Sequence, residues 1–165
     1  MILLGLDPGI GRTGFGVLNT SQPALYVQSG VLTTPPGPLA ERLRLLGQDL
    51  AELLSRTKPD HAVVEAIFFG TNKKTAMLTA HARGVLLYVL RQHHISVTSL
   101  TPLQIKSRLT GFGGADKEQV QTIVTKRLSL AAPPQPDDAA DALAAALCLA
   151  DMELSLAGLA SASGL

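Results

Sequence analysis

The amino-acid sequence predicts an α/β fold: a mixed five-stranded sheet, three antiparallel strands followed by two parallel ones, with helices on both faces. Two observations predict this class. Three apolar runs of strand-like composition follow one another from the N-terminus, and strand and helix patterns alternate after them. Strands joined by short turns pair antiparallel, whereas a strand reached through a helical crossover lies parallel to its neighbour. The 165 residues suffice for one domain around one core.

The first predicted strand is an apolar run that ends at Pro8-Gly9, and a breaker at residues 19–23 separates the next two. The three predicted strands are Ile2–Asp7, Gly14–Leu18 and Leu25–Thr33. The segment Leu39–Arg56 then carries leucines at alternating steps of four and three, with charges on the other face. This spacing predicts an amphipathic helix.

The rest of the chain alternates between short strands and helices. The expected strands are His61–Ala66 and Ile95–Thr98, and the expected helices are Thr71–Gln92, Pro102–Leu109, Asp116–Leu128 and an Ala-rich Asp137–Leu154. Asp137 or Asp138 could cap the last helix. We therefore expect one domain over residues 1–154 and a flexible C-terminal tail over residues 155–165.

Four acidic residues interrupt apolar segments, where an ionised carboxylate is costly unless something pairs with it. Asp7 and Glu65 end the first and fourth strands, which are predicted to be parallel neighbours, so both acids reach the sheet edge where α/β folds bind ligands. Asp138 and Asp141 share one face of the last helix. No Lys or Arg lies at helical or strand spacing beside Asp7 or Glu65. The sequence therefore predicts a divalent cation as the partner.

Each acid also has an ordinary structural explanation. Asp7 could form the turn before Pro-Gly, Glu65 could be an exposed strand end, and Asp138 and Asp141 could serve the start of a helix. All four together favour a metal site. Carboxylates without His-rich or Cys-rich spacing suit Mg²⁺ or Mn²⁺, and two such ions are suited to phosphodiester hydrolysis.

The distribution of charge points to a polyanionic substrate. The net charge is only +1, but residues 66–127 hold nine basic and two acidic residues. No apolar stretch is long enough for a membrane helix, and the N-terminal run is too short for a signal peptide, so we expect no membrane association and a cytoplasmic protein. Cys148 is the only cysteine and is expected to be a small buried apolar residue.

Four segments resemble, in order and spacing, the RuvC family of Holliday-junction resolvases, over essentially residues 1–150. They are GLDPGIGRTGFGVL, VVEAIFF with Asn72, Ala76 and Ala82-Arg83-Gly84 after it, PLQIKSRLTGFGGADKEQV, and PDDAADALAAA. Each alone is weak, but the combination is specific. The resemblance implies a ribonuclease H-like fold, a homodimer and cleavage of four-way junction DNA. It also implies junction-binding and branch-migration motor subunits of the RuvA and RuvB type as partners.

By the same resemblance, the metal-binding acids fall on Asp7, Glu65, Asp138 and Asp141, with two Mg²⁺ or Mn²⁺ ions between them. Asp137 leaves open which of the adjacent acids faces the metal. The aromatic residue near the junction crossover falls on Phe68, although Phe69 could exchange roles with it, and the DNA-contacting lysines fall on Lys106 and Lys117.

The segment FFGTNKK has two interpretations. An exposed Phe could stack on an unpaired base while Asn72, Lys73 and Lys74 hold phosphates. The alternative is a surface loop with one core Phe. Likewise, Lys106 and Lys117 could be solvated helix residues.

Symmetric cuts in two strands require two copies of one carboxylate cluster, so we expect a two-fold dimer. The predicted helix Thr71–Gln92 offers Met77, Leu78, Leu86 and Leu90 for the interface. Two other functions remain open: a ribonuclease H-like nuclease acting on another nucleic acid, and a non-catalytic junction-binding module. An actin-like phosphotransferase would need a second such domain, for which the chain is too short.

Overall fold

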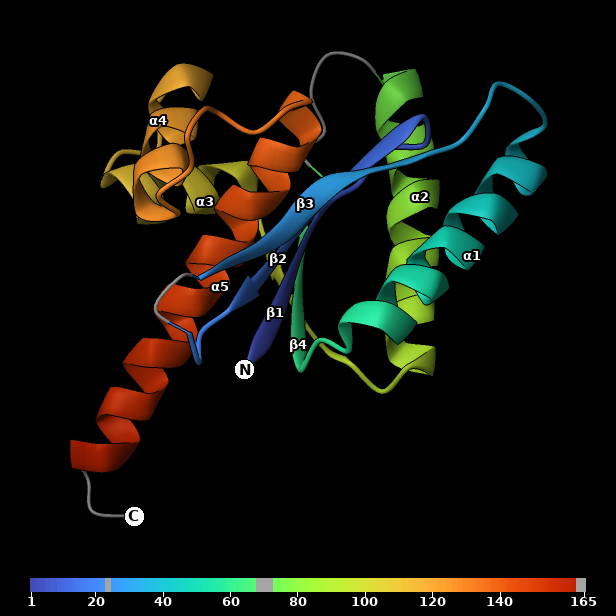
Figure 1. Cartoon of the computed structure of the whole chain (residues 1–165). Helices are drawn as coiled ribbons and strands as arrows, with labels where there is room; N and C mark the ends of the chain where they lie inside the picture. The colour runs from blue at the N-terminus through green and yellow to red at the C-terminus, as the bar shows by residue number, and fades with distance from the viewer. Residues whose placement is uncertain (23–24, 68–72, 163–165) are drawn as a thin grey trace.

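The computed structural model describes residues 1–22, 25–67 and 73–162, and its centre is one mixed sheet (Figure 1). The strands are β1 (Ile2–Asp7), β2 (Arg12–Asn19), β3 (Tyr26–Thr33), β4 (His61–Glu65) and β5 (Ser96–Leu100). Their order in the sheet is β3-β2-β1-β4-β5. The first three pair antiparallel, and β1, β4 and β5 run parallel. The predicted sheet is therefore confirmed, including the parallel pairing of the first and fourth strands.

Helices cover both faces of this sheet, as predicted. They are α1 (Leu39–Thr57), α2 (Lys73–Gln92), α3 (Pro102–Thr110), α4 (Lys117–Arg127) and α5 (Asp137–Ala162). In Figure 1, α1 and α2 lie on one side of the strands, and α3, α4 and α5 lie on the other. No helix in the described ranges is both long and apolar enough to span a membrane.

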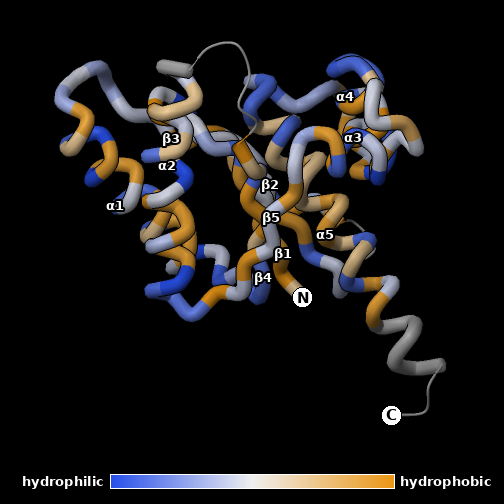
Figure 2. The backbone as a smooth tube through the Cα atoms, turned by 180° about the vertical axis from the view of Figure 1, so that it is seen from behind, coloured by the Kyte–Doolittle hydropathy of each residue, from blue (hydrophilic) through white to orange (hydrophobic). Residues whose placement is uncertain are grey.

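Two apolar cores follow from the alternation of side chains along the strands. Leu4 and Leu6 pack with α1 and α2, whereas Leu3 packs with the helices on the opposite face. Hydrophobic positions concentrate along the central strands and on the helix surfaces that face them (Figure 2). Leu86 and Leu90 are fully buried in the core with α1. The prediction that they lie in a dimer interface is therefore wrong, because both side chains pack inside the chain's own core.

Helix α5 lies unusually close to the sheet because the strands beneath it present glycines. A Cβ atom at Gly5 would lie 2.0 Å from the carbonyl oxygen of Ala142, and one at Gly14 would lie 1.9 Å from that of Asp138. Both distances are far below van der Waals contact. The alanines of α5 from Ala139 to Ala150 are buried, among them Ala142 and Ala146 at the contact with Gly5.

Capping residues define the helices on the α5 side. Thr101 and Asp116 each form a capping box, with Gln104 and Gln119 respectively, at the starts of α3 and α4. Helix α5 begins at Asp137 itself, so Asp137 and Asp138 lie in its first turn and the predicted cap is wrong.

The far end of α5 also differs from the prediction. The helix continues to Ala162, although the sequence favoured an end near Leu154. The added residues are mostly Ala, Leu and Ser without proline, and Ala and Leu favour helix strongly enough to extend it.

Candidate active site

The parallel pairing of β1 and β4 brings Asp7 and Glu65 together. Leu6 pairs with Val64, so the next residue of each strand lies at the same carboxyl-terminal edge. Asp7 has the same parity as Leu3, and Glu65 the same parity as Val63, and both of those residues pack in the core under α5. Both carboxylates therefore lie on the α5 side of the sheet.

The first turns of α5 bring in the other acids. The contact of Gly14 with the backbone of Asp138 fixes the height of the helix over the strand edge. A cavity of about 200 Å³ lies there. Its lining residues are Asp7, Glu65, Pro102, Ile105, Lys106, Lys117, Val120, Asp141 and Ala144. Three of the four predicted acids and both predicted lysines thus line one cavity.

Burial and mutual repulsion raise the pKa values of two of these carboxyl groups well above the ordinary range. Burial, followed by the charges of Asp141 and Asp138, raises the pKa of Asp7 to about 7. Burial, followed by the charges of Asp7 and Asp141, raises the pKa of Glu65 to about 8. Burial also raises the pKa of Asp141, against the opposing effect of Lys117. These shifts indicate a site that would favour a bound cation.

Two basic side chains, Lys117 and Arg12, already supply part of the positive charge that these acids favour. The Nζ atom of Lys117 lies 3.1 Å from Oδ2 of Asp137 and 3.2 Å from Oδ2 of Asp141. Partial burial lowers the pKa of Lys117, but its hydrogen bonds and the charges of those two acids outweigh burial and raise it. Arg12 lies with its Nε 3.1 Å from Oδ2 of Asp138. Sequence spacing could not reveal these partners, because packing brings them from β2 and α4.

The structure distinguishes Asp137 from Asp138. The side chain of Asp137 is 53% exposed, and its hydrogen bonds with Lys117 and Gln121 hold its pKa below the ordinary value. Asp138 is 23% exposed. Its Oδ2 atom is buried and accepts no hydrogen bond, because the nearby N–H of Arg12 forms an ion pair without hydrogen-bond alignment. Asp138 also acts electrostatically on Asp7. Asp138 is therefore the more buried of the two acids and the one whose charge acts on Asp7.

The donor set fits a divalent metal ion. Carboxylate oxygens dominate it, one of them is buried without a hydrogen bond, and two of the acids have strongly raised pKa values. Within the described part of the chain, no three His, Cys, Asp or Glu side chains converge tightly enough on one point to enclose an ion. The acids surround the cavity instead, with the ammonium group of Lys117 against Asp141.

Some of the predicted DNA-contacting residues cannot be compared with this arrangement. Phe68, Phe69 and Asn72 lie outside the described residues. Lys73 and Lys74 begin α2, but their side chains also lie outside the description.

Arg83 has a role at the edge of the site that spacing did not reveal. Its Nε donates to the backbone oxygen of Glu65 at 3.1 Å, and its Nη2 donates to Oγ of Ser99 at 2.7 Å. The guanidinium group therefore ties α2 to the ends of β4 and β5. Arg83 therefore has a packing role at this edge of the sheet.

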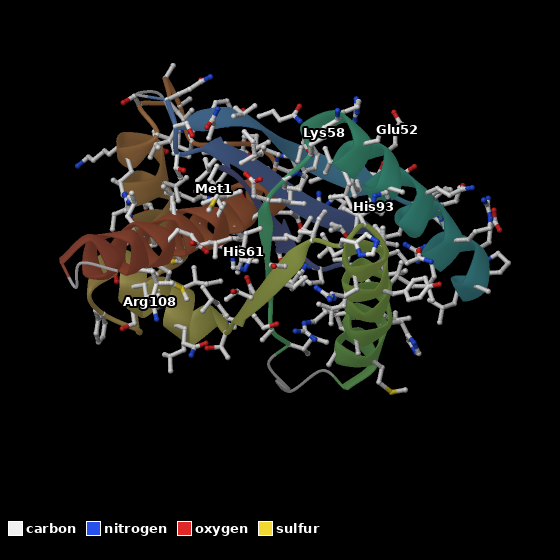
Figure 3. All side chains as sticks on the ribbon, turned by 90° about the horizontal axis from the view of Figure 1, so that it is seen from below. Met1, Glu52, Lys58, His61, His93 and Arg108 are labelled. Carbon is white, nitrogen blue, oxygen red and sulfur yellow. The ribbon has the colours of Figure 1, made fainter. Side chains whose placement is uncertain are left out.

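The opposite end of β4 carries a different polar contact. His61, labelled in Figure 3, lies between the strand and α5. Its Nδ1 lies 2.7 Å from Glu153 and its Nε2 lies 3.0 Å from Oγ1 of Thr98. Cys148 is buried as expected, with its pKa raised by burial to about 12. These residues stabilise the fold away from the cavity.

Comparison with known proteins agrees with this geometry. The family model for crossover junction endodeoxyribonuclease RuvC matches residues 3–149. The chain belongs to the RuvC family. A RuvC from Desulforamulus reducens is 43% identical over 96% of this chain and 98% of its own length. A RuvC from Chloroflexus aggregans is 47% identical over 90% of this chain and 92% of its own.

RuvC structures from Thermus thermophilus superpose on most of the chain. One has a TM-score of 0.81 at 34% identity, covering 90% of this chain and 92% of that one. A second, in complex with a Holliday junction substrate, has a TM-score of 0.83 at 33% identity over the same shares. A yeast mitochondrial resolvase, Ydc2, shares the fold at a TM-score of 0.63, 14% identity and coverage of 88% of this chain and 77% of its own. The ribonuclease H-like fold is confirmed, and the chain is a metal-dependent crossover junction endodeoxyribonuclease.

Proposed function

We propose that Asp7, Glu65, Asp138 and Asp141 form the catalytic site and bind two Mg²⁺ or Mn²⁺ ions, so that the enzyme makes symmetric cuts in two strands of a four-way junction. The single observation that carries this proposal is the convergence of carboxylates from β1, β4 and α5 on one cavity. Evenly distributed surface acids would not have their pKa values raised by one another.

Each residue then has a distinct part in hydrolysis. The bound ions would supply an activated water and stabilise the oxygen that leaves phosphorus. The charges of Asp141 and Asp138 raise the pKa of Asp7, and the charge of Asp7 raises that of Glu65, so Asp7 interacts with acids of both groups, which supports contact with both ions. Glu65 would complete one ion's ligands, and Asp138 and Asp141 the other's. Lys106 and Lys117 line the cavity and would hold the negatively charged phosphate there.

The DNA surface extends beyond this cavity in the proposal. Phe68 or Phe69 would stack on a base near the crossover, and Asn72, Lys73 and Lys74 would hold phosphates. The Holliday junction bound by the RuvC of T. thermophilus supports four-way DNA as the substrate.

We also propose a homodimer, because one chain holds one cavity and resolution needs two cuts. On α2, Met77 and Tyr88 are 62% and 64% exposed. They and Gly84 are spaced by seven and four residues, which puts them on one helix face. Partners of the RuvA and RuvB type belong to the proposal by family resemblance, and a cytoplasmic location stays a prediction.

The decisive experiment replaces one carboxylate without changing its size. Asp7→Asn is expected to reduce junction cutting by at least about a thousandfold, because metal-assisted catalysis depends on that oxygen charge. Binding should stay within about threefold, since phosphate contacts supply most of the affinity. Gel-shift titration and single-turnover cleavage in Mg²⁺ or Mn²⁺ measure the two quantities, with excess RNA–DNA hybrid as competitor.

Glu52→Gln is the matched control, because Glu52 is 71% exposed on α1, as labelled in Figure 3. It should cut at the normal rate. Normal cutting by Asp7→Asn would refute the assigned site, and preferential cutting of the hybrid would refute the junction as the substrate.

A further inference from the structure

Two large apolar side chains are exposed on α3, which contributes Pro102, Ile105 and Lys106 to the carboxylate cavity, and on the loop after it. The proposed chemistry does not use them. Leu103 on α3 is 65% exposed, and Phe112 in the loop after α3 is 66% exposed. These are the highest values among the large hydrophobic residues whose exposure the structure describes. Exposed apolar groups of this size, clustered together, commonly mark a contact surface.

This apolar surface is continuous with the catalytic cavity. A groove of about 450 Å³ is lined by Thr101, Pro102, Leu103, Lys106 and Gly113. Pro102 and Lys106 also line the cavity that holds Asp7 and Glu65. A polymer whose phosphate lies in the cavity would therefore place its adjoining unit in the groove.

The loop that presents Phe112 is held by hydrogen bonds. Gly111 ends α3 with φ of 76°, and the Oγ1 atom of Thr110 donates to the carbonyl of Phe112 at 2.8 Å and accepts from its N–H at 3.0 Å. Gly113 allows Leu103 to close against the loop, because a Cβ there would lie 2.6 Å from Leu103 Cδ1. The surface is thus largely formed before any ligand binds, which lowers the entropic cost of binding.

Charge distinguishes the groove from the hollow that Phe112 lines. Lys106 lines the groove with Leu103 and Gly113, whereas Phe112, the residue before Gly113, lines a neighbouring hollow together with Asp116 and Glu118. A phosphate is attracted to the groove and repelled from the hollow. A DNA base carries no charge and can stack on an aromatic ring.

We propose that Leu103 and Phe112 form a nucleotide-positioning surface, in which Leu103 contacts the sugar and Phe112 the base of the nucleotide next to the scissile phosphate. The inference rests on the proposed function and deepens it. Lys106, which lines both the cavity and the groove, would hold the scissile phosphate, and the apolar pair would fix the strand so that the scissile bond faces the carboxylates. The pair is a positioning device and takes no part in the bond-breaking step.

The experiment uses the full chain and a four-way junction with 2-aminopurine next to the mapped scissile phosphate. Phe112→Ala should lower single-turnover cleavage by roughly 5-fold to 150-fold, the range expected for one base stack. It should also remove the fluorescence change of the bound probe while junction affinity stays within about threefold. Phe112→Trp should restore both, and Leu103→Ala should broaden the distribution of cut positions.

Leu154→Ala is the matched control, because Leu154 is 60% exposed on α5 and lines neither the cavity nor the groove. All these side chains are exposed, so thermal unfolding should remain unchanged. Phe112→Ala with wild-type cleavage and wild-type probe fluorescence overturns the inference, as does a change in oligomeric state alone.

Failure of the function itself gives a different pattern. A wild-type chain that binds the junction without cutting it would refute the catalytic proposal, and the fluorescence comparison would still decide the role of Phe112. A wild-type chain that does not bind the junction would overturn both.

Discussion

At the scale of single residues, the two adjacent acids at the start of α5 have different surroundings and should have different roles. Asp138→Asn is expected to abolish cutting, because its Oδ2 is buried without a hydrogen bond and its charge acts on Asp7. Asp137→Asn should reduce cutting by no more than about tenfold, because it weakens only the solvent-exposed ion pair between Asp137 and Lys117. Single-turnover cleavage compares the two, and equal losses would contradict this assignment.

The pKa shifts of Asp7 and Glu65 also predict how stability depends on pH without metal. Their pKa values rise from 3.8 and 4.5 in the unfolded chain to about 7 and 8 in the folded protein. Between about pH 4 and pH 8 the folded state therefore binds more protons, so stability should fall as pH increases across this window. Asp7→Asn in EDTA should be more stable than wild type near pH 9, by on the order of 2 kcal/mol.

Urea unfolding near pH 5 and near pH 9 measures this difference, and Glu52→Gln again serves as the control. Adding Mg²⁺ should stabilise wild type more at the higher pH, where the ligands are already deprotonated. Identical pH slopes for wild type and Asp7→Asn would show that burial does not perturb this carboxyl.

At the scale of elements, the close packing of α5 on the sheet controls where two of the four acids lie. Gly14→Ala should destabilise the protein by about 3 kcal/mol, at the upper end of the cost of overpacking, because the new methyl group meets helix backbone. It should also weaken metal binding, because the helix that carries Asp138 and Asp141 must move. Thermal unfolding and calorimetric Mn²⁺ titration test both effects.

Gly37→Ala provides the control for this substitution, since a Cβ at Gly37 would meet nothing within 4 Å. It should leave both stability and metal affinity unchanged. If Gly14→Ala also leaves both quantities unchanged, the contact between Gly14 and the backbone of Asp138 does not determine the distance of α5 from the sheet.

At the scale of the whole molecule, much of the architecture could be predicted, because the periodic spacing of hydrophobic residues and the positions of turn residues determine the helices and strands. The leucines of α1 and the apolar run that ends at Asp7 gave the right elements, and the crossover rule gave the right strand order. The extent of α5 was missed, because an Ala-rich and Leu-rich segment without proline has no clear stop signal. The ion pairs of Lys117 and Arg12 could not be predicted, because they depend on how α4 and β2 pack against α5.

The exposed face of α2 predicts how two molecules would associate. A double substitution, Met77→Glu and Tyr88→Glu, should dissociate the proposed dimer, because it would put charges into the proposed apolar contact. Paired cuts on the junction should then become unpaired single nicks. Sedimentation measures the association, and denaturing gels of both labelled strands measure the pairing of cuts. Leu154→Glu is the control, and a monomeric wild type with fully paired cuts would contradict the dimer.

The close seating of α5 over β1 and β2 has a consequence for the enzyme during its own synthesis. Asp7 and Glu65 leave the ribosome early, but half of the proposed ligand set is encoded far downstream, from Asp138 onward. A nascent or prematurely terminated polypeptide that stops before α5 would contain only two of the four proposed metal ligands. It would also lack the helix that covers this apolar face of the sheet. Such fragments should be unable to nick chromosomal DNA, so the enzyme would become able to cut only after α5 has been translated.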